Sequence, residues 1–192
     1  ELKEQPYSLN VEKARSLLAE AGYGDGFDLE IIVRTAQERI EIAQTLQSTF
    51  AQVGINVSIT QGTGKQTLTK YRARGFDIYV GAWGPDYPDP HTNADTFAHN
   101  PNNSDEAKLT GKLAWRVAWD IPEMTAATSA AVEEADLDTR RQMYIDIQRE
   151  HQRTSPFVPM FQKIEQVGRR ANVKGFVTGS AITAAFYWTV TK

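Results

Sequence analysis

The residues best suited to chemistry in this sequence lie in the segment GAWGPDYPDP, residues 81–90. Two aromatic side chains, Trp83 and Tyr87, alternate there with two carboxylates, Asp86 and Asp89, and the segment contains three prolines. Because proline fixes φ, such a segment loses little conformational entropy when it becomes ordered. Aromatic faces attract cations, and a carboxylate pairs with an ammonium group. The segment is therefore predicted to form a rigid wall for a ligand with an apolar body and a cationic end.

The same segment also has a purely structural interpretation. Trp83 would then belong to the core, and Asp86 and Asp89 would be turn residues that bond their own backbone. For Asp89, which stands between two prolines, we favour this role and predict that it fixes the loop through backbone hydrogen bonds. Asp86 is the carboxylate that we expect to meet a ligand.

The other residues with catalytic or metal-binding potential form weaker patterns. The histidines His91, His99 and His151 have no zinc-site spacing, and cysteine is absent, which excludes disulfides and thiol chemistry. His91 and His99 share one predicted loop with Asp89 and Asp95, so a metal site is conceivable there, but such residues are more often solvated. There is no G-x-S-x-G motif, and GTGKQT lacks the glycine spacing of a phosphate loop. We predict no metal and no cofactor, and the resemblance described below implies that the chain is not an enzyme.

Length and composition limit the class of protein. The 192 residues, of which 41% are hydrophobic and 23% charged, suit one globular domain with an ordinary core. The net charge of −3 without a basic stripe argues against nucleic-acid binding. No apolar run approaches the length of a membrane span.

The elements that must position the 81–90 segment alternate between helix and strand in the first half of the chain. Asn10 is a predicted N-cap, and Gly22, Gly54 and Gly75 are predicted helix stops. Hydrophobic periodicity predicts helices over 11–21, 37–54 and 65–75, and strands over 27–33, 55–60 and 76–83. This order predicts an α/β fold with crossover connections.

The second half of the chain changes character. Residues 85–103 are rich in Pro, Asp, Asn and His and are predicted to form a long ordered loop. Pro122 is predicted to open a helix, and Asp138 to cap another over 139–152 with Met143, Tyr144 and Ile147 facing inward. Strands are predicted over 156–162, at a sheet edge, and over 186–190, and 163–170 is expected to pair with the first of them.

Taken together, these segments resemble the C-terminal lobe of the family-5 extracellular solute-binding proteins, which are the dipeptide, oligopeptide and nickel receptors of ABC importers. The resemblance runs in order through nearly the whole chain. Its motifs are the opening helix SLNVEKARSLLAEAGYGDGF, the helix–GI–strand step LQSTFAQVGINVSIT, the G-W-x-x-D-x-x-D-P loop in FDIYVGAWGPDYPDP, the D-x-x-x-R-x-x-x-Y helix in EEADLDTRRQMYIDIQREHQRTSPFVPMF, and RRANVKGF.

The resemblance implies a periplasmic-binding-protein-like lobe, with a mixed sheet flanked by helices, of the large type II class with two lobes. Residues 1–192 would be a single C-terminal lobe, and the last strand, about 185–191, is assigned either to this lobe or to the partner lobe. The implied function is capture of a peptide-like or other small solute for delivery to ABC permease subunits. The implied receptor is monomeric, and periplasmic or attached to the membrane by a lipid anchor outside this chain.

The resemblance also suggests site residues. In peptide-binding members of the family, the acid at the position of Asp86 pairs with the amino group of the ligand, and Trp83 and Tyr87 would flank it. The stretch WRVAWDIPEM departs from the family pattern, with Trp115 and Arg116 in a region where an Asn is common. Arg116 would be able to hold a carboxylate or phosphate bidentately beside Trp115. The alternative is that Arg116 pairs with a nearby acid and Trp115 packs in the interior.

Two other functions remain open from the sequence. One is a hydrolase that uses loop carboxylates such as Asp86 and Asp89. The other is a chemosensory solute-binding module, since a fold does not determine a function.

Overall fold

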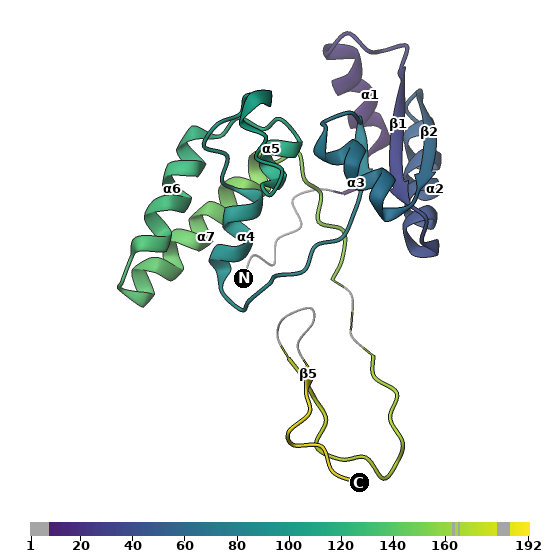
Figure 1. Cartoon of the computed structure of the whole chain (residues 1–192). Coiled ribbons are helices and arrows are strands. Elements are labelled where there is room, and N and C mark those ends of the chain that lie inside the picture. The colour runs from purple at the N-terminus through teal and green to yellow at the C-terminus, as the bar shows by residue number, and fades with distance from the viewer. Residues whose placement is uncertain (1–7, 163, 165, 180–184) are drawn as a thin grey trace. The chain divides into compact units, whose positions relative to one another are not determined.

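The computed structural model describes residues 8–162, 164, 166–179 and 185–192 (Figure 1). The chain divides into two compact units, Glu1–Ala82 and Trp83–Lys192. The α/β fold class predicted from the sequence is confirmed, with parallel strand pairs in the first unit and an antiparallel pair in the second.

The first unit is built on a three-stranded parallel sheet. Its strands are β1 (Phe27–Arg34), β2 (Ile55–Gly62) and β3 (Ile78–Val80), in the order β2-β1-β3, and Ile31 of β1 pairs with both Ile59 and Ile78. Central strands of parallel sheets are covered on both faces, which requires a continuous apolar run. Ile31, Ile32 and Val33 meet this requirement and are fully buried.

Three helices flank this sheet (Figure 1), and some of their ends follow from local sequence signals. They are α1 (Val11–Glu20), α2 (Gln37–Ala51) and α3 (Gly64–Arg72). Asn10 caps α1 as predicted, because its Oδ1 accepts a hydrogen bond of 2.9 Å from the Lys13 amide. Gly54, just beyond α2, has a φ of +83°, which favours glycine as predicted.

Side chains from the helices complete the core of the first unit. Ile31 and Val33 pack in one cluster with Ile55, Val57 and Val80 and with apolar residues of the helices, namely Leu18, Ile42, Ala43, Leu46 and Phe50. Tyr71 of α3 stacks on Tyr79 of β3 at 4.1 Å between ring centroids. This core fixes the position of β3, from which the 81–90 segment departs.

Two sequence predictions in this unit were wrong in detail. The strand predicted over 76–83 is limited to Ile78–Val80, which pairs with β1 alone. The left-handed residue after α3 is Arg74, with a φ of +58°, and not Gly75.

The second unit is mainly helical. Its helices are α4 (Pro90–Phe97), the 3-10 helix η1 (Asp105–Ala107), α5 (Leu113–Arg116), α6 (Pro122–Glu133) and α7 (Leu137–Thr154). Their shared core consists of Ala94, Ala98, Ala114, Ile121, Met124, Ala131, Tyr144 and Ile147, with Met143 packed against it. Pro122 opens α6, and Tyr144 and Ile147 face inward, as predicted.

The structure corrects four predictions in this unit. Residues 85–103 contain α4, because the Asp-Pro pair that reads as a turn is here an N-cap followed by proline at the first helical position. The cap of α7 is Asp136 and not Asp138, since Asp136 accepts the Thr139 amide hydrogen bond at 2.9 Å. No strand forms over 156–162, and in the C-terminal segment the described strands are β4 (Val177–Thr178) and β5 (Ala185–Phe186), so the strand predicted over 186–190 is largely irregular. The pairing expected for 163–170 falls partly outside the described residues.

Candidate functional site

The 81–90 segment begins where β3 ends. Val80 pairs with Val33 of β1, so both strands finish at the same carboxyl edge of the sheet. In open parallel α/β sheets, ligands bind outside the carboxyl ends of the strands. The segment therefore starts at the edge of the first unit where a ligand site is expected, and it continues into the second unit.

Trp83 is held by α4 but remains accessible. Its indole Nε1 donates a hydrogen bond of 2.9 Å to Oδ1 of Asn93, and its ring meets that of Phe97 edge to face, with centroids 5.8 Å apart. The side chain is still 40% exposed. Trp83 thus combines a fixed orientation with substantial exposure.

Asp86 and Tyr87 lie between the two ends of the segment and point their side chains to solvent. Asp86 is exposed, and Tyr87 is 47% exposed. Asp86, Trp83 and Tyr87 are thus all accessible to a ligand. Their contact with a solute stays a prediction.

Asp89 closes the segment and has several partners. Its Oδ1 accepts a hydrogen bond of 2.8 Å from the His91 amide at the start of α4, which confirms the predicted backbone role. The guanidinium of Arg140 in α7 donates to both carboxylate oxygens, with distances of 3.1 Å and 2.9 Å. The Arg140 hydrogen bonds lower the pKa of Asp89, and the His91 amide acts in the same direction. Asp89 is therefore an ionised structural residue and is poorly placed to act as a catalytic base.

Arg140 is itself supported by the core of the second unit. Its guanidinium carbon lies 4.9 Å from the centroid of the Tyr144 ring, a cation–π geometry. Tyr144 is 8% exposed, and its hydroxyl lies 3.0 Å from Nδ1 of His91. The chain of contacts Asp89–Arg140–Tyr144–His91 joins α7 to the first turn of α4.

Trp115 and Arg116 are placed in the interior of the second unit. They are 4% and 8% exposed, respectively. The Trp115 indole donates to the carbonyl of Ser104 at 2.9 Å, and Nε of Arg116 donates to the carbonyl of Thr110 at 2.7 Å. This burial favours the packing role that the sequence left as the alternative, and a solute contact for either residue stays a prediction.

The remaining titratable residues near α4 form an ionic cluster. Asp95 pairs with Lys112, and its Oδ1 lies 3.0 Å from Nδ1 of His99. Burial lowers the pKa of His99, and the charge of Lys112 adds to this effect. Within the described part of the chain, no group of three His, Cys, Asp or Glu side chains is arranged to hold a metal ion.

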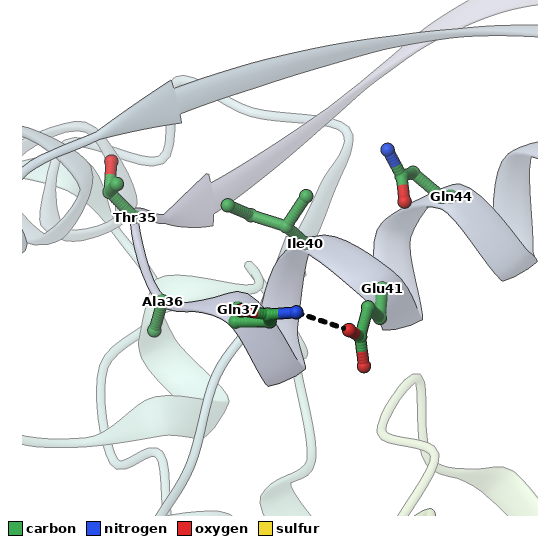
Figure 2. Close-up of a pocket in the computed structure, with 6 residues that line it drawn as sticks. All are labelled: Thr35, Ala36, Gln37, Ile40, Glu41 and Gln44. Carbon is green, nitrogen blue, oxygen red and sulfur yellow. Dashed lines mark hydrogen bonds between the residues drawn. The ribbon is translucent and has the colours of Figure 1, made fainter.

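A separate shallow hollow lies in the first unit, at the carboxyl end of β1 and the first turns of α2 (Figure 2). Its volume is about 340 Å³, and its lining residues are Thr35, Ala36, Gln37, Ile40, Glu41 and Gln44. Along α2, the side chain of Gln37 donates a hydrogen bond of 2.9 Å to that of Glu41, one turn further on, as Figure 2 shows. These residues were not predicted from the sequence, because their types and spacing form no recognisable binding motif.

Sequence reasoning also missed Asn93, Phe97 and Arg140 as partners of the 81–90 segment. One signal for Arg140 was available. Asp136, the N-cap of α7, is followed at every fourth position by Arg140 and Tyr144, which share one face of the helix, and that spacing matches the D-x-x-x-R-x-x-x-Y motif.

Known proteins match this chain over most of its length. Di/tripeptide-binding protein 4 of Pseudomonas aeruginosa is 28% identical over 90% of this chain, which covers 32% of that protein. The solved structure of a dipeptide-binding protein from Pseudoalteromonas sp. SM9913 in complex with Met-Leu has a TM-score of 0.74 at 24% identity, over 96% of this chain and 36% of that one. HbpA2 from Haemophilus parasuis has a TM-score of 0.79 at 23% identity, over 100% of this chain and 37% of that one. This chain thus spans about a third of the length of the proteins that it matches.

A family model matches more than half of the chain and so shows the family to which it belongs. Residues 1–105 match the model of the bacterial extracellular solute-binding proteins, family 5 Middle. In the part of the chain that the structure describes, no helix has both the length and the apolar character needed to cross a membrane. The chain belongs to family 5 of the bacterial extracellular solute-binding proteins.

Proposed function

We propose that this chain is part of the solute-binding component of an ABC importer, which captures a peptide-like or other small solute between two lobes and delivers it to the permease subunits. The observation that carries this proposal is the family match over residues 1–105. The di/tripeptide-binding protein of Pseudomonas aeruginosa and the Met-Leu complex support a short peptide as the first solute to test. The proposed location is the periplasm, or the outer face of a membrane through a lipid anchor outside this chain.

The proposed site is centred on Asp86. Its exposed carboxylate would bind the amino group of the solute, and Trp83 and Tyr87 would provide the apolar wall beside it. An ammonium–carboxylate pair is a strong, charge-assisted contact when the solute is enclosed. The exposure of all three side chains and the fixed orientation of Trp83 support this assignment.

We also propose that residues 1–192 form a single C-terminal lobe of a larger two-lobe receptor, which acts as a monomer and does not bind nucleic acid. The share of its relatives that this chain spans supports a second lobe. The C-terminal segment supports it as well, because its large apolar side chains are strongly exposed, namely Val158, Phe161, Ile164, Tyr187 and Trp188. A two-stranded sheet such as β4–β5 is marginally stable by itself. The second lobe would cover this segment, including the last strand at about 185–191.

We propose that the site binds its solute and does not hydrolyse it. The hydrolase alternative needs a free carboxylate pair, whereas Asp89 is engaged by Arg140 through both of its oxygens. The test is calorimetric titration of the full-length receptor with the dipeptide Met-Leu and with N-acetyl-Met-Leu, followed by mass spectrometry of the recovered peptide. We expect saturable binding of intact Met-Leu and much weaker binding of the acetylated peptide. Release of free Met and Leu would contradict the proposal and favour the hydrolase.

A further inference from the structure

The segment that carries Asp86 is fixed at both of its ends by side chains from two different helices. The part between the fixed ends, residues 84–88, is called the 84–88 loop below. At its beginning, Trp83 donates its indole hydrogen to Asn93 and packs edge to face on Phe97, both of them in α4. The first end of the loop is thereby attached to α4.

The other end of the loop is attached to α7. Asp89 follows the loop directly, and its carboxylate accepts two hydrogen bonds from Arg140 at 3.1 Å and 2.9 Å. The same carboxylate accepts the His91 amide at 2.8 Å and so caps α4. A bidentate arginine–carboxylate pair fixes orientation as well as distance, which a lysine in the same place would not do.

The attachment to α7 rests on the buried core and does not depend on surface charge alone. The Arg140 side chain is 19% exposed. Its guanidinium lies over the ring of Tyr144, and the Tyr144 hydroxyl lies 3.0 Å from Nδ1 of His91. Tyr144 belongs to the hydrophobic core of the second unit. The position of Arg140 is therefore determined by packing, and Arg140 transmits that position to Asp89.

We infer that Arg140 and Asn93 are positioning residues, which hold the two ends of the 84–88 loop so that Asp86 and Tyr87 are presented in one arrangement. This inference rests on the proposed function only for the identity of the solute that meets the loop. A loop that is ordered before binding loses little conformational entropy when the solute binds, which increases affinity. The prolines at positions 85 and 88 restrict the loop between the fixed ends in the same way.

The inference also links two segments that are far apart in the sequence. The second aspartate of G-W-x-x-D-x-x-D-P is Asp89, and the arginine of D-x-x-x-R-x-x-x-Y is Arg140. The structure brings these two residues into direct contact. The first aspartate of the loop motif, Asp86, is left exposed for the solute.

Three variants separate positioning from general stabilisation. Arg140→Gln removes both hydrogen bonds to Asp89. Asp89→Asn removes the ion pair but keeps an oxygen that can accept the His91 amide, so it preserves the cap of α4. Arg140→Lys keeps the charge without the bidentate geometry. Arg149→Gln is the matched control, because Arg149 is an exposed arginine on the same helix that pairs with Asp146.

The first measurement reports on loop order without any solute. Backbone ¹⁵N order parameters of Asp86 and Tyr87 are expected to fall from about 0.85 in the unmodified chain to below about 0.6 in Arg140→Gln and Asp89→Asn. The order parameters of the α6 amides are expected to stay unchanged in every variant. Arg149→Gln is expected to leave the order parameters of Asp86 and Tyr87 unchanged, and Arg140→Lys is expected to give intermediate values. Asn93→Ala is expected to loosen the loop at Trp83, whereas Asn93→Asp keeps the acceptor for the indole and restores its order.

The second measurement is calorimetric titration of the full-length receptor with Met-Leu. Arg140→Gln and Asp89→Asn are expected to weaken binding by about tenfold or more, while Arg149→Gln binds normally. Unchanged order parameters in Arg140→Gln would overturn the positioning role, whatever the peptide does. Lower order parameters with unchanged Met-Leu affinity would overturn the link between loop order and binding. If the unmodified receptor fails to bind Met-Leu while the loop responds as expected, the positioning role stands and the proposed solute is wrong.

Discussion

The carboxylate of Asp89 and the guanidinium of Arg140, which are 51 residues apart in the chain, form a bidentate ion pair with distances of 3.1 Å and 2.9 Å. The pair joins the start of α4 to the first half of α7. It assigns the two aspartates of the 81–90 segment to different tasks. Asp89 maintains the structure, and Asp86, which is exposed, is available to a solute.

The first prediction concerns Asp86. Asp86→Ala is expected to leave the melting temperature nearly unchanged, because the side chain is exposed. It is expected to weaken Met-Leu binding to the full-length receptor by about 2–5 kcal/mol, since the peptide ammonium would lose its buried partner. Calorimetry with Met-Leu and N-acetyl-Met-Leu measures this effect. Equal losses for the two peptides would show that Asp86 does not contact the amino group.

The second prediction concerns Asp89. Asp89→Ala is expected to lower the free energy of unfolding of the second unit by about 1–3 kcal/mol, because it removes a helix cap and leaves Arg140 without its main partner. Asp89→Asn, which keeps the cap, is expected to cost less. Urea unfolding followed by tryptophan fluorescence is a selective measurement, because all four tryptophans lie in the second unit. An Asn variant as unstable as the Ala variant would show that the ion pair, and not the cap, dominates.

The third prediction concerns pH and His151. This histidine stacks on Phe157 and meets Trp119 edge to face, and burial lowers its pKa. The unfolded chain therefore binds a proton at a higher pH than the folded chain does, so stability is complete above about pH 6.5 and falls as the pH is lowered through that value. His151→Phe, which keeps an aromatic ring, is expected to flatten this dependence between about pH 7.5 and about pH 5.5.

The control for His151 is His99, whose pKa is also lowered by burial. His99→Asn is expected to remove its own part of the pH dependence and to leave that of His151. If the free energy of unfolding of His151→Phe kept the same pH dependence, folding would not lower the pKa of His151.

The fourth prediction concerns the C-terminal segment. Trp188→Asp is expected to have little effect on the stability of the 192-residue chain, where Trp188 is 78% exposed. In the full-length receptor the same variant is expected to lower stability by about 3 kcal/mol or more, since a charge would be placed under the second lobe. Leu137→Asp, at a leucine that is 77% exposed at the start of α7, is the matched control and is expected to be harmless in both proteins. A harmless Trp188→Asp in the full-length receptor would contradict the proposed coverage.

The sequence predicted the first unit well because local signals there agree with the tertiary structure. The strands show apolar residues either in a continuous run, as in β1, or at alternate positions, as in β2. Helices begin or end at Asn10, Gly22 and Gly54, where capping chemistry favours those residue types. The second unit was harder to predict. The Asp89-Pro90 pair is equally suited to a turn and to a helix start, and the local sequence does not decide between them. In the structure Asp89 caps α4 and also pairs with Arg140 of α7.

The partners of the candidate site could be predicted only in part. Asp86, Trp83 and Tyr87 stand out because of their chemistry, but Asn93 and Arg140 are ordinary polar residues on helix surfaces until the fold brings them to the segment. Conversely, Trp115 and Arg116 have the side chains of a binding site, yet the short helix α5 places both in the interior. Periodicity identifies helices and strands, but it does not tell which polar groups meet across the fold.

The strand order β2-β1-β3 has a consequence for how the chain acquires its structure. Every pairing in this sheet is parallel, so β1 has no hairpin partner and must wait for α2 and β2, and then for α3 and β3, to be synthesised. During that interval the apolar run Ile31–Val33 is open to chaperones and to aggregation. In the second unit, α6 and α7 are consecutive in sequence and pack directly on each other, and such low contact order favours rapid folding. We therefore expect the helices that leave the ribosome later to reach their native packing in less time than the sheet that leaves it first.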